Sequence, residues 1–154
     1  MTNRYSMIFA MGPDFRDIIL LRKPSNHKNP LFRDKWTVPG GLIEEGETDT
    51  EGATRELWEE SQIQVAPADL VPVLKFLCNC DATEPEHEIA VFGVIVPVGQ
   101  LLKAKGEITE PVTVVRDLPE NLLWYVEPLF DLVKARMRQP LETTRDATGA
   151  EVLQ

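Results

Sequence analysis

The feature that most constrains the fold of this 154-residue chain is an acidic stretch that follows a Pro-Gly-Gly sequence. Between Glu44 and Glu60 the chain contains eight acidic residues and one arginine, Arg55, but no lysine. The stretch therefore contributes −7 to a net charge of −9. Because like charges at this density repel one another, we expect the stretch to have a role that uses its carboxylates.

Residues 49–62 are the best helix candidate within this stretch. Thr48 or Asp49 can cap the N-terminus, and acidic side chains in the first turn suit the helix dipole. The preceding segment Pro39–Gly41 is expected to interrupt regular structure. Its glycines also let the backbone approach the helix closely, so a main-chain carbonyl can serve as a cation ligand, although a plain turn would use them too.

Three carboxylates share one face of the predicted helix. At about 100° per residue, Glu56, Glu59 and Glu60 fall on the same side, and only Glu59 has a cation, Arg55, one turn away. Like charges at this spacing destabilise an isolated helix by about 0.2–0.5 kcal/mol per pair. The alternatives are an ordinary acidic surface helix and a site for Mg²⁺, which prefers oxygen ligands and often bridges carboxylates to substrate phosphates.

The rest of the chain predicts a mixed sheet with helices packed against it. A second helix is predicted for 128–139, with Pro128 in its first turn, and a loop for 24–35. We expect one domain over 1–139 and a flexible tail over 140–154. Apolar or alternating runs predict strands at 4–11 and 17–23, joined as a hairpin, and at 70–80, 88–98 and 111–118.

Composition excludes several classes of protein. The net charge of −9 argues against nucleic-acid binding, and no apolar run is long enough to cross a membrane. The N-terminus shows no signal-peptide pattern, so a cytoplasmic location is expected. Cys78 and Cys80 are accordingly expected to be reduced thiols.

The acidic stretch resembles the Nudix box, G-x5-E-x7-R-E-U-x-E-E-x-G-U, in which U is an apolar aliphatic residue. It spans 23 of the 154 residues, and one position departs, because Gln62 stands where the box has glycine. That position follows the helix end, so we expect either a left-handed C-cap at which glutamine costs about 1 kcal/mol or a different helix ending. The matching residues are Gly41, Glu47, Arg55, Glu56, Leu57, Glu59, Glu60 and Ile63.

The resemblance implies an α/β fold, a Nudix-type α/β/α sandwich with a mixed sheet, close to the MutT-like nucleotide pyrophosphohydrolases. It also implies hydrolysis of a diphosphate linkage in a nucleoside diphosphate derivative, with Mg²⁺ or Mn²⁺. Arg55 would orient Glu47 or Glu56, with a simple Glu59 ion pair as the alternative. Glu60 is the first choice of general base, with Glu110 or Glu107 as supplements or ordinary loop acids. The implied metal ligands are Gly40, through its carbonyl, Glu56, Glu59, Glu60 and Glu110.

Substrate contacts are expected near the box and before the last helix. The candidates for base recognition are aromatic and amide side chains, and core packing is the alternative role for each aromatic. Arg22 and Lys23 close the second predicted strand, where they could meet a terminal phosphate or simply be solvated. The base candidates are Trp36, Asn121, Trp124 and Tyr125.

The substrate favoured by the resemblance is a nucleoside or deoxynucleoside triphosphate, cut to the monophosphate and pyrophosphate. Residues 78–81 contain neither the proline nor the tyrosine that marks the sugar-nucleotide and dinucleoside polyphosphate types. A sugar-nucleotide pyrophosphatase of the ADP-ribose type and a non-catalytic nucleotide-binding module are the alternatives. The resemblance also suggests a homodimer.

Overall fold

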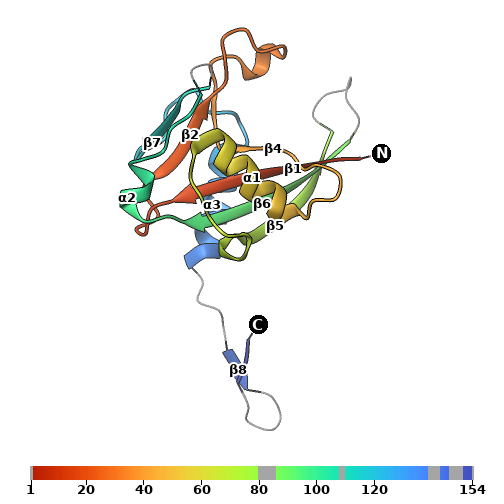
Figure 1. The fold of residues 1–154 in the computed structure, drawn as a ribbon, viewed down its shortest axis with the longest axis vertical. Helices are drawn as coiled ribbons and strands as arrows, with labels where there is room; N and C mark the ends of the chain where they lie inside the picture. The colour runs from red at the N-terminus through yellow and green to blue at the C-terminus, as the bar shows by residue number, and fades with distance from the viewer. Residues whose placement is uncertain (1, 80–85, 108–109, 139–142, 146–150, 154) are drawn as a thin grey trace.

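The computed structural model describes residues 2–79, 86–107, 110–138, 143–145 and 151–153. Its centre is a seven-stranded mixed sheet, with helix α1 on one face and helix α3 on the other (Figure 1). The strands of this sheet are β1 (Asn3–Met11), β2 (Ile18–Arg22), β3 (Trp36–Thr37), β4 (Gly40–Leu42), β5 (Val71–Cys78), β6 (His87–Ile95) and β7 (Val112–Val115). The helices are α1 (Asp49–Ser61), α2 (Val98–Leu101) and α3 (Val126–Arg138), with 3-10 turns at Pro30–Phe32 and Pro67–Asp69.

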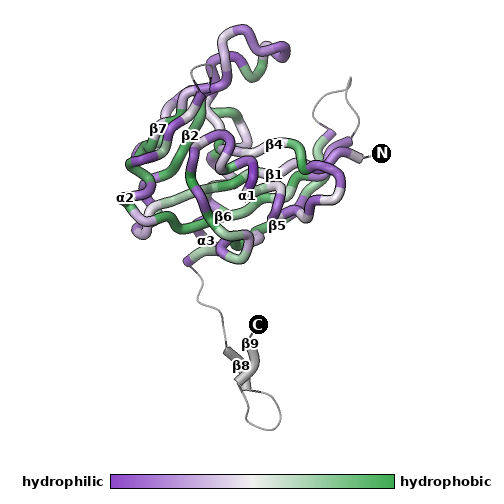
Figure 2. The backbone as a smooth tube through the Cα atoms, in the orientation of Figure 1, coloured by the Kyte–Doolittle hydropathy of each residue, from purple (hydrophilic) through white to green (hydrophobic). Residues whose placement is uncertain are grey.

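Alternation along β1 divides the core into two layers. Ile8 and Ala10 pack in the cluster that contains α1, whereas Phe9 and Met11 pack in the cluster that contains α3. Successive strand residues point to opposite faces, so both faces of the sheet are covered. Figure 2 shows hydrophobic residues along the central strands and hydrophilic residues in the loop that follows β2. The predicted α/β/α sandwich is therefore the observed fold.

The first two strands form less of a hairpin than the sequence predicted. They are antiparallel but pair only at Met11 and Ile18, because β4 pairs with β1 over Tyr5–Met7. The other edge of β1 runs parallel to β6 along its whole length. Strand β2 instead pairs with β3 and β7, so β1 and β2 diverge from their common end.

The expectation that Pro39–Gly41 interrupts regular structure is wrong for the two glycines, which begin β4. A Cβ atom on Gly40 would overlap the carbonyl oxygen of Ser6 on β1. Glycine removes this obstacle, so the strand can pair closely with its neighbour. The same pairing places the Pro-Gly-Gly segment beside helix α1.

The ends of α1 agree with the sequence. The hydroxyl oxygen of Thr48 accepts a hydrogen bond from the amide of Glu51 and caps the helix. Gln62 is the C-cap residue and adopts the left-handed conformation, with φ of 59°. The glutamine therefore occupies the strained backbone geometry for which the Nudix box uses glycine.

The described part of the chain beyond β7 contains one helix and two short strands. Helix α3 begins at Val126, two residues before the predicted start at Pro128, which lies in its first turn as expected. The predicted tail contains strands β8 (Thr143–Arg145) and β9 (Glu151–Leu153), which pair with each other in a separate two-stranded sheet.

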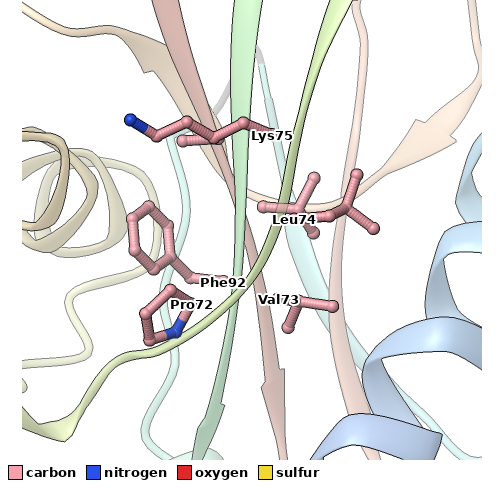
Figure 3. Close-up of a pocket in the computed structure, with 7 residues that line it drawn as sticks. Pro72, Val73, Leu74, Lys75 and Phe92 are labelled. Carbon is pink, nitrogen blue, oxygen red and sulfur yellow. The ribbon is translucent and has the colours of Figure 1, made fainter.

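Strand β5 is an edge of the main sheet and contains a register shift between Pro72 and Leu74. A mainly apolar hollow of about 160 Å³ lies at this irregularity, and none of the predicted site residues lines it (Figure 3). Cys78 at the end of β5 is disulfide-bonded, so the expectation of a reduced thiol is wrong there, while Cys80 lies outside the described residues. No helix in the described part of the chain has the length and apolar character that a bilayer crossing requires.

Candidate active site

Arg55 connects the glutamates of the acidic stretch to one another and to β4. Its Nε and Nη2 atoms donate to the two carboxylate oxygens of Glu47, both at 2.9 Å. Nη1 donates to Glu56 at 2.9 Å and to Glu59 at 3.1 Å, and Nη2 also reaches the carbonyl oxygen of Leu42 at 2.9 Å. Both the orienting contacts and the alternative Glu59 pair are thus present.

The bidentate contact with Arg55 fixes the charge of Glu47. The hydrogen bond from Arg55, with a second from the backbone amide of Glu44, lowers the pKa of Glu47. In turn, the hydrogen bond to Glu47 is the main cause that raises the pKa of Arg55. The pair therefore stays ionised and acts as a rigid brace between the loop before α1 and the helix itself.

Glu60 is the most perturbed carboxyl group in the site. Its pKa is raised to about 7, chiefly by burial; the hydrogen bond from the Gly40 amide and the charge of Lys23 oppose this shift, and the charges of Glu56 and Glu110 add to it. The Gly40 amide donates to Oε1 of Glu60 at 2.8 Å. The contact of Gly40 with the site is therefore made by its amide, while the sequence analysis had named its carbonyl.

Gly41 creates the space that the Glu56 carboxyl group occupies. A Cβ atom at position 41 would lie 2.6 Å from the carboxyl carbon of Glu56. Burial is the largest effect on the pKa of Glu56, which is raised although Arg55 opposes the shift. Two partly buried carboxyl groups, Glu56 and Glu60, therefore lie side by side against the glycines of β4.

The three carboxylates of this helix face have different hydrogen-bond partners. Glu56 and Glu59 turn toward Arg55, and Glu60 turns toward Gly40. Across the described ranges, no group of three or more His, Cys, Asp or Glu side chains is arranged to hold a metal ion.

The chemistry of the donors nevertheless fits a hard cation. Glu56 and Glu60 are desolvated acids whose raised pKa values show that their negative charge is incompletely compensated. A divalent cation would supply that compensation, and oxygen atoms are the ligands it prefers. For all three glutamates to bind one cluster of ions, Glu56 and Glu59 would have to leave Arg55.

The structure brings Glu110 to this group through a contact that the sequence analysis missed. The Nζ atom of Lys23, the residue after β2, lies 3.5 Å from Oε1 of Glu110. The charge of Lys23 lowers the pKa of Glu60, and the charge of Glu110 raises it. The position of Lys23 at the end of a buried strand was a usable signal. Glu107 is exposed and makes no hydrogen bond or ion pair with the described residues.

Trp36 and Tyr125 have different surroundings. Trp36 is half-buried in β3, and the guanidinium carbon of Arg22 lies 5.9 Å from its ring centre. The Tyr125 hydroxyl instead shares a hydrogen bond of 2.9 Å with Thr37, and burial raises the pKa of Tyr125 to about 12. Both side chains pack against the core cluster that contains α3, and the Trp36 ring also contacts Arg22.

Asn121 ties the end of the 24–35 loop to β3. Its side-chain amide donates to the main-chain carbonyl oxygen of Asp34 at 2.7 Å. Its main-chain carbonyl oxygen accepts a hydrogen bond from the backbone amide of Trp36 at 3.0 Å. Trp124 is 73% exposed and meets Tyr125 edge-on. Asn121 thus holds the backbone beside Trp36, while Trp124 offers an aromatic surface to solvent.

Solved structures with a similar fold include several MutT proteins. A MutT NUDIX hydrolase from Burkholderia pseudomallei matches with a TM-score of 0.68 and 17% identity, over 86% of this chain and 98% of that one. A MutT protein from Methanosarcina mazei Go1 gives 0.62 and 22%, over 90% and 96%. A MutT structure from a study of Aliivibrio salmonicida and Vibrio cholerae gives 0.64 and 21%, over 88% and 99%. At these identities the likeness concerns the fold.

A search of curated proteins finds no match. The family model described as NUDIX domain, however, matches residues 2–127. The matched range includes the whole acidic stretch, the glycines of β4 and the Arg55 contacts described above. The chain therefore belongs to the Nudix family.

Proposed function

We propose that this protein hydrolyses a diphosphate linkage in a nucleoside diphosphate derivative with the help of Mg²⁺. The proposed substrate is a nucleoside or deoxynucleoside triphosphate, which would yield the monophosphate and pyrophosphate. The observation that supports this most is the pair of partly buried acids, Glu56 and Glu60, packed against Gly40 and Gly41. Such a pair repels a phosphate unless a cation mediates between them.

Glu56, Glu59 and Glu60 would hold the Mg²⁺, with the Gly40 backbone and Glu110 beside them, and Mn²⁺ would substitute. A bound divalent cation in this position lowers the pKa of a coordinated water and neutralises charge on the phosphates. Arg55 would stabilise the loop that precedes α1 by keeping its bidentate contact with Glu47.

Glu60 is the proposed general base. A carboxyl group with a pKa of about 7 can both accept and release a proton near neutral pH. The amide of Gly40 orients the group through Oε1, which leaves the other carboxylate oxygen for proton transfer. Glu110, which pairs with Lys23, would supplement Glu60 in this role.

The nucleoside would stack on the half-buried ring of Trp36, beside Arg22, whose guanidinium group lies over that ring at the end of β2. Trp36 stands four residues before Gly40 in the chain, so β3 and β4 connect the proposed base site directly to the carboxylates. Asn121 and Trp124 border this site, with the Asn121 side-chain amide already bonded to Asp34.

A second candidate function is a nucleotide-binding module without catalysis. The observation that favours it is the engagement of Glu56 and Glu59 by Arg55, which competes with metal binding. In such a module the acidic helix would have a structural role, and the protein would bind a nucleotide through Trp36 alone.

A screen for phosphate and pyrophosphate release tests the two candidates. The substrates are the common ribo- and deoxyribonucleoside triphosphates and diphosphates and ADP-ribose, each with Mg²⁺, Mn²⁺ or EDTA. The proposal expects metal-dependent release of pyrophosphate from at least one triphosphate. Cleavage of ADP-ribose alone would favour the sugar-nucleotide alternative. Binding of a nucleotide without turnover, followed by Trp fluorescence, would favour the binding module.

A further inference from the structure

The overall acidity of the protein conceals a basic segment between β2 and β3. Residues 22–35 contain five of the sixteen lysines and arginines and a single acid, Asp34, which gives the segment a net charge of +4. The remainder of the chain then carries −13. The five cations are Arg22, Lys23, Lys28, Arg33 and Lys35.

Several of these cations lack an acidic partner. Within the part of the chain that the structure describes, Arg22, Arg33 and Lys35 form no ion pair. The guanidinium of Arg33 donates instead to the neutral carbonyl oxygen of His27 at 2.8 Å. Asp34, the acid of the segment, accepts a hydrogen bond from Ser25. By contrast Arg4, Lys75 and Arg116 elsewhere in the fold are each paired with aspartate.

The segment is held in shape by its own hydrogen bonds. The amide of Lys23 donates to the carbonyl oxygen of Lys35 at 2.9 Å and closes the neck of the loop. Inside the loop, Asn29 caps the 3-10 turn at Pro30–Phe32, and the rings of His27 and Phe32 stack at 5.3 Å. A loop with this internal bonding can hold several cations in place with only one acid, Asp34, among them.

The loop lies next to the candidate active site. Its first cation beyond β2, Lys23, contacts Glu110 and acts electrostatically on Glu60. Its other end leads directly into Trp36. Figure 1 shows the loop, in orange, projecting from the sheet beyond the end of β2, and Figure 2 shows that most of it is hydrophilic.

We propose that residues 22–35 form an anion site that binds a phosphate group of the substrate lying beyond the diphosphate linkage that is cleaved. The inference rests on the proposed function for the position of that linkage, and it narrows the substrate class. A nucleoside triphosphate carries such a group, whereas a nucleoside diphosphate has none and a sugar nucleotide carries a neutral sugar in its place. The loop therefore selects nucleotides with at least three phosphates.

Charge also sets the size of the anion. A nucleic-acid strand extends its phosphates over many residues and would be repelled by the net charge of −13 on the rest of the chain. A short polyphosphate presents its charges within the reach of one loop. The ligand is thus a compact polyanion.

Isothermal titration calorimetry with inorganic tripolyphosphate in EDTA tests the site without metal or turnover. The wild type is expected to bind, and Arg33→Gln/Lys35→Gln is expected to lower the affinity about tenfold. The matched control is Lys103→Gln/Lys105→Gln, which removes the same charge from exposed positions outside the loop and should change the affinity less than about twofold.

Arg33 also bonds to His27, so a conservative variant separates charge from loop structure. Arg33→Lys retains the charge and should retain most of the tripolyphosphate affinity. The single variant Arg33→Gln is measured beside it. If Arg33→Lys loses as much tripolyphosphate affinity as Arg33→Gln, the contribution comes from loop structure and the proposal is wrong. No binding by the wild type, or equal losses in the loop variant and the control, would also overturn it. Tighter binding of a 20-nucleotide single strand than of tripolyphosphate, lost in the loop variant, would assign the loop to nucleic acid instead.

Turnover then tells a failure of this inference from a failure of the proposed function. With an active enzyme, Arg33→Gln/Lys35→Gln should raise KM for a triphosphate about tenfold at unchanged kcat. If the double variant releases pyrophosphate with an unaltered KM, the proposed hydrolase function stands and the anion site is wrong. If the loop binds tripolyphosphate but no nucleotide is hydrolysed, the anion site stands and the proposed hydrolase function is wrong.

Discussion

At the scale of single residues, Glu60 and Gln62 lie two positions apart, and each lowers stability for a different reason. Glu60 is a carboxyl group held by a backbone amide in a largely buried place, which costs stability when it is ionised. Gln62 has no ligand role and instead takes a backbone conformation that favours glycine. Both positions were recognisable from the box pattern, but only the structure shows what holds Glu60.

The variant Glu60→Gln should remove most of the turnover while the fold persists. The amide keeps the shape and can still accept from Gly40, but it loses the charge and the basicity. We expect kcat to fall by about 10²–10⁴, which is the usual contribution of a general base. Steady-state kinetics with thermal unfolding as the fold control measure this, and an unchanged kcat would exclude both a base role and a ligand role for Glu60.

The raised pKa of Glu60 predicts how stability depends on pH in EDTA. Because the folded state binds this proton more tightly than the unfolded state, the contribution is complete below about pH 4.5 and is lost as the pH rises through about 7. Between these values the wild type should lose up to about 3 kcal/mol relative to Glu60→Gln. Urea unfolding of both proteins at several pH values measures the difference. A constant difference across the range would show that Glu60 has an ordinary pKa.

The variant Gln62→Gly should stabilise the protein by about 1 kcal/mol, because glycine adopts the left-handed C-cap conformation without a Cβ penalty. Gln62→Ala is the control, since alanine retains that penalty. Urea unfolding compares the two. A gain with alanine as large as that with glycine would point to the glutamine side chain and not to the backbone.

At the scale of elements, the arrangement that positions the site is the approach of β4 to α1. The start of α1 was predictable from sequence because capping by Thr48 is a local effect. Strand β4 was not, since a Pro-Gly-Gly segment forms a strand here only through its pairing with Ser6 and Met7 on β1. Long-range pairing of this kind leaves no local pattern in the sequence.

The variant Gly41→Ala tests this approach. The added Cβ would collide with the carboxyl group of Glu56, which is the flexible end of a side chain, so the fold should survive while the carboxyl group moves. We expect kcat to fall at least about tenfold, as displaced catalytic groups lose orientation. Gly99→Ala, which meets no atom within 4 Å, is the control and should behave as wild type. Normal turnover in Gly41→Ala would mean that the position of Glu56 is not critical.

At the scale of the whole molecule, the proposed site combines an acidic body, a basic loop and an aromatic side chain between them. The family and the sandwich fold were predictable, because the box pattern and the apolar runs are properties of the sequence. The side-chain arrangement was not, because Arg55 can pair with Glu47, Glu56 and Glu59 at once and the sequence does not rank these contacts. The basic loop is visible in the sequence but is masked by the total charge of −9.

The variant Trp36→Ala tests whether the base and phosphate sites act separately. Loss of the stacking surface should raise KM for a nucleoside triphosphate by about tenfold, since base–aromatic stacking contributes about 1–3 kcal/mol. Binding of tripolyphosphate, which has no base, should not change. Steady-state kinetics and calorimetry measure the two effects. An unaltered KM would indicate that Trp36 packs in the core and does not contact the base.

The central claim is that the acidic stretch holds divalent cations against a diphosphate. A crystal structure with Mn²⁺ and a non-hydrolysable nucleoside triphosphate, recorded with anomalous scattering, tests it most directly. The account predicts anomalous peaks that place Mn²⁺ ions within bonding distance of Glu56, Glu59 and Glu60. It also predicts that Glu56 and Glu59 no longer contact Arg55 and that the diphosphate of the nucleotide contacts the ions. Arg55 still bonded to Glu56 and Glu59, with no anomalous peak at the carboxylates, would contradict it.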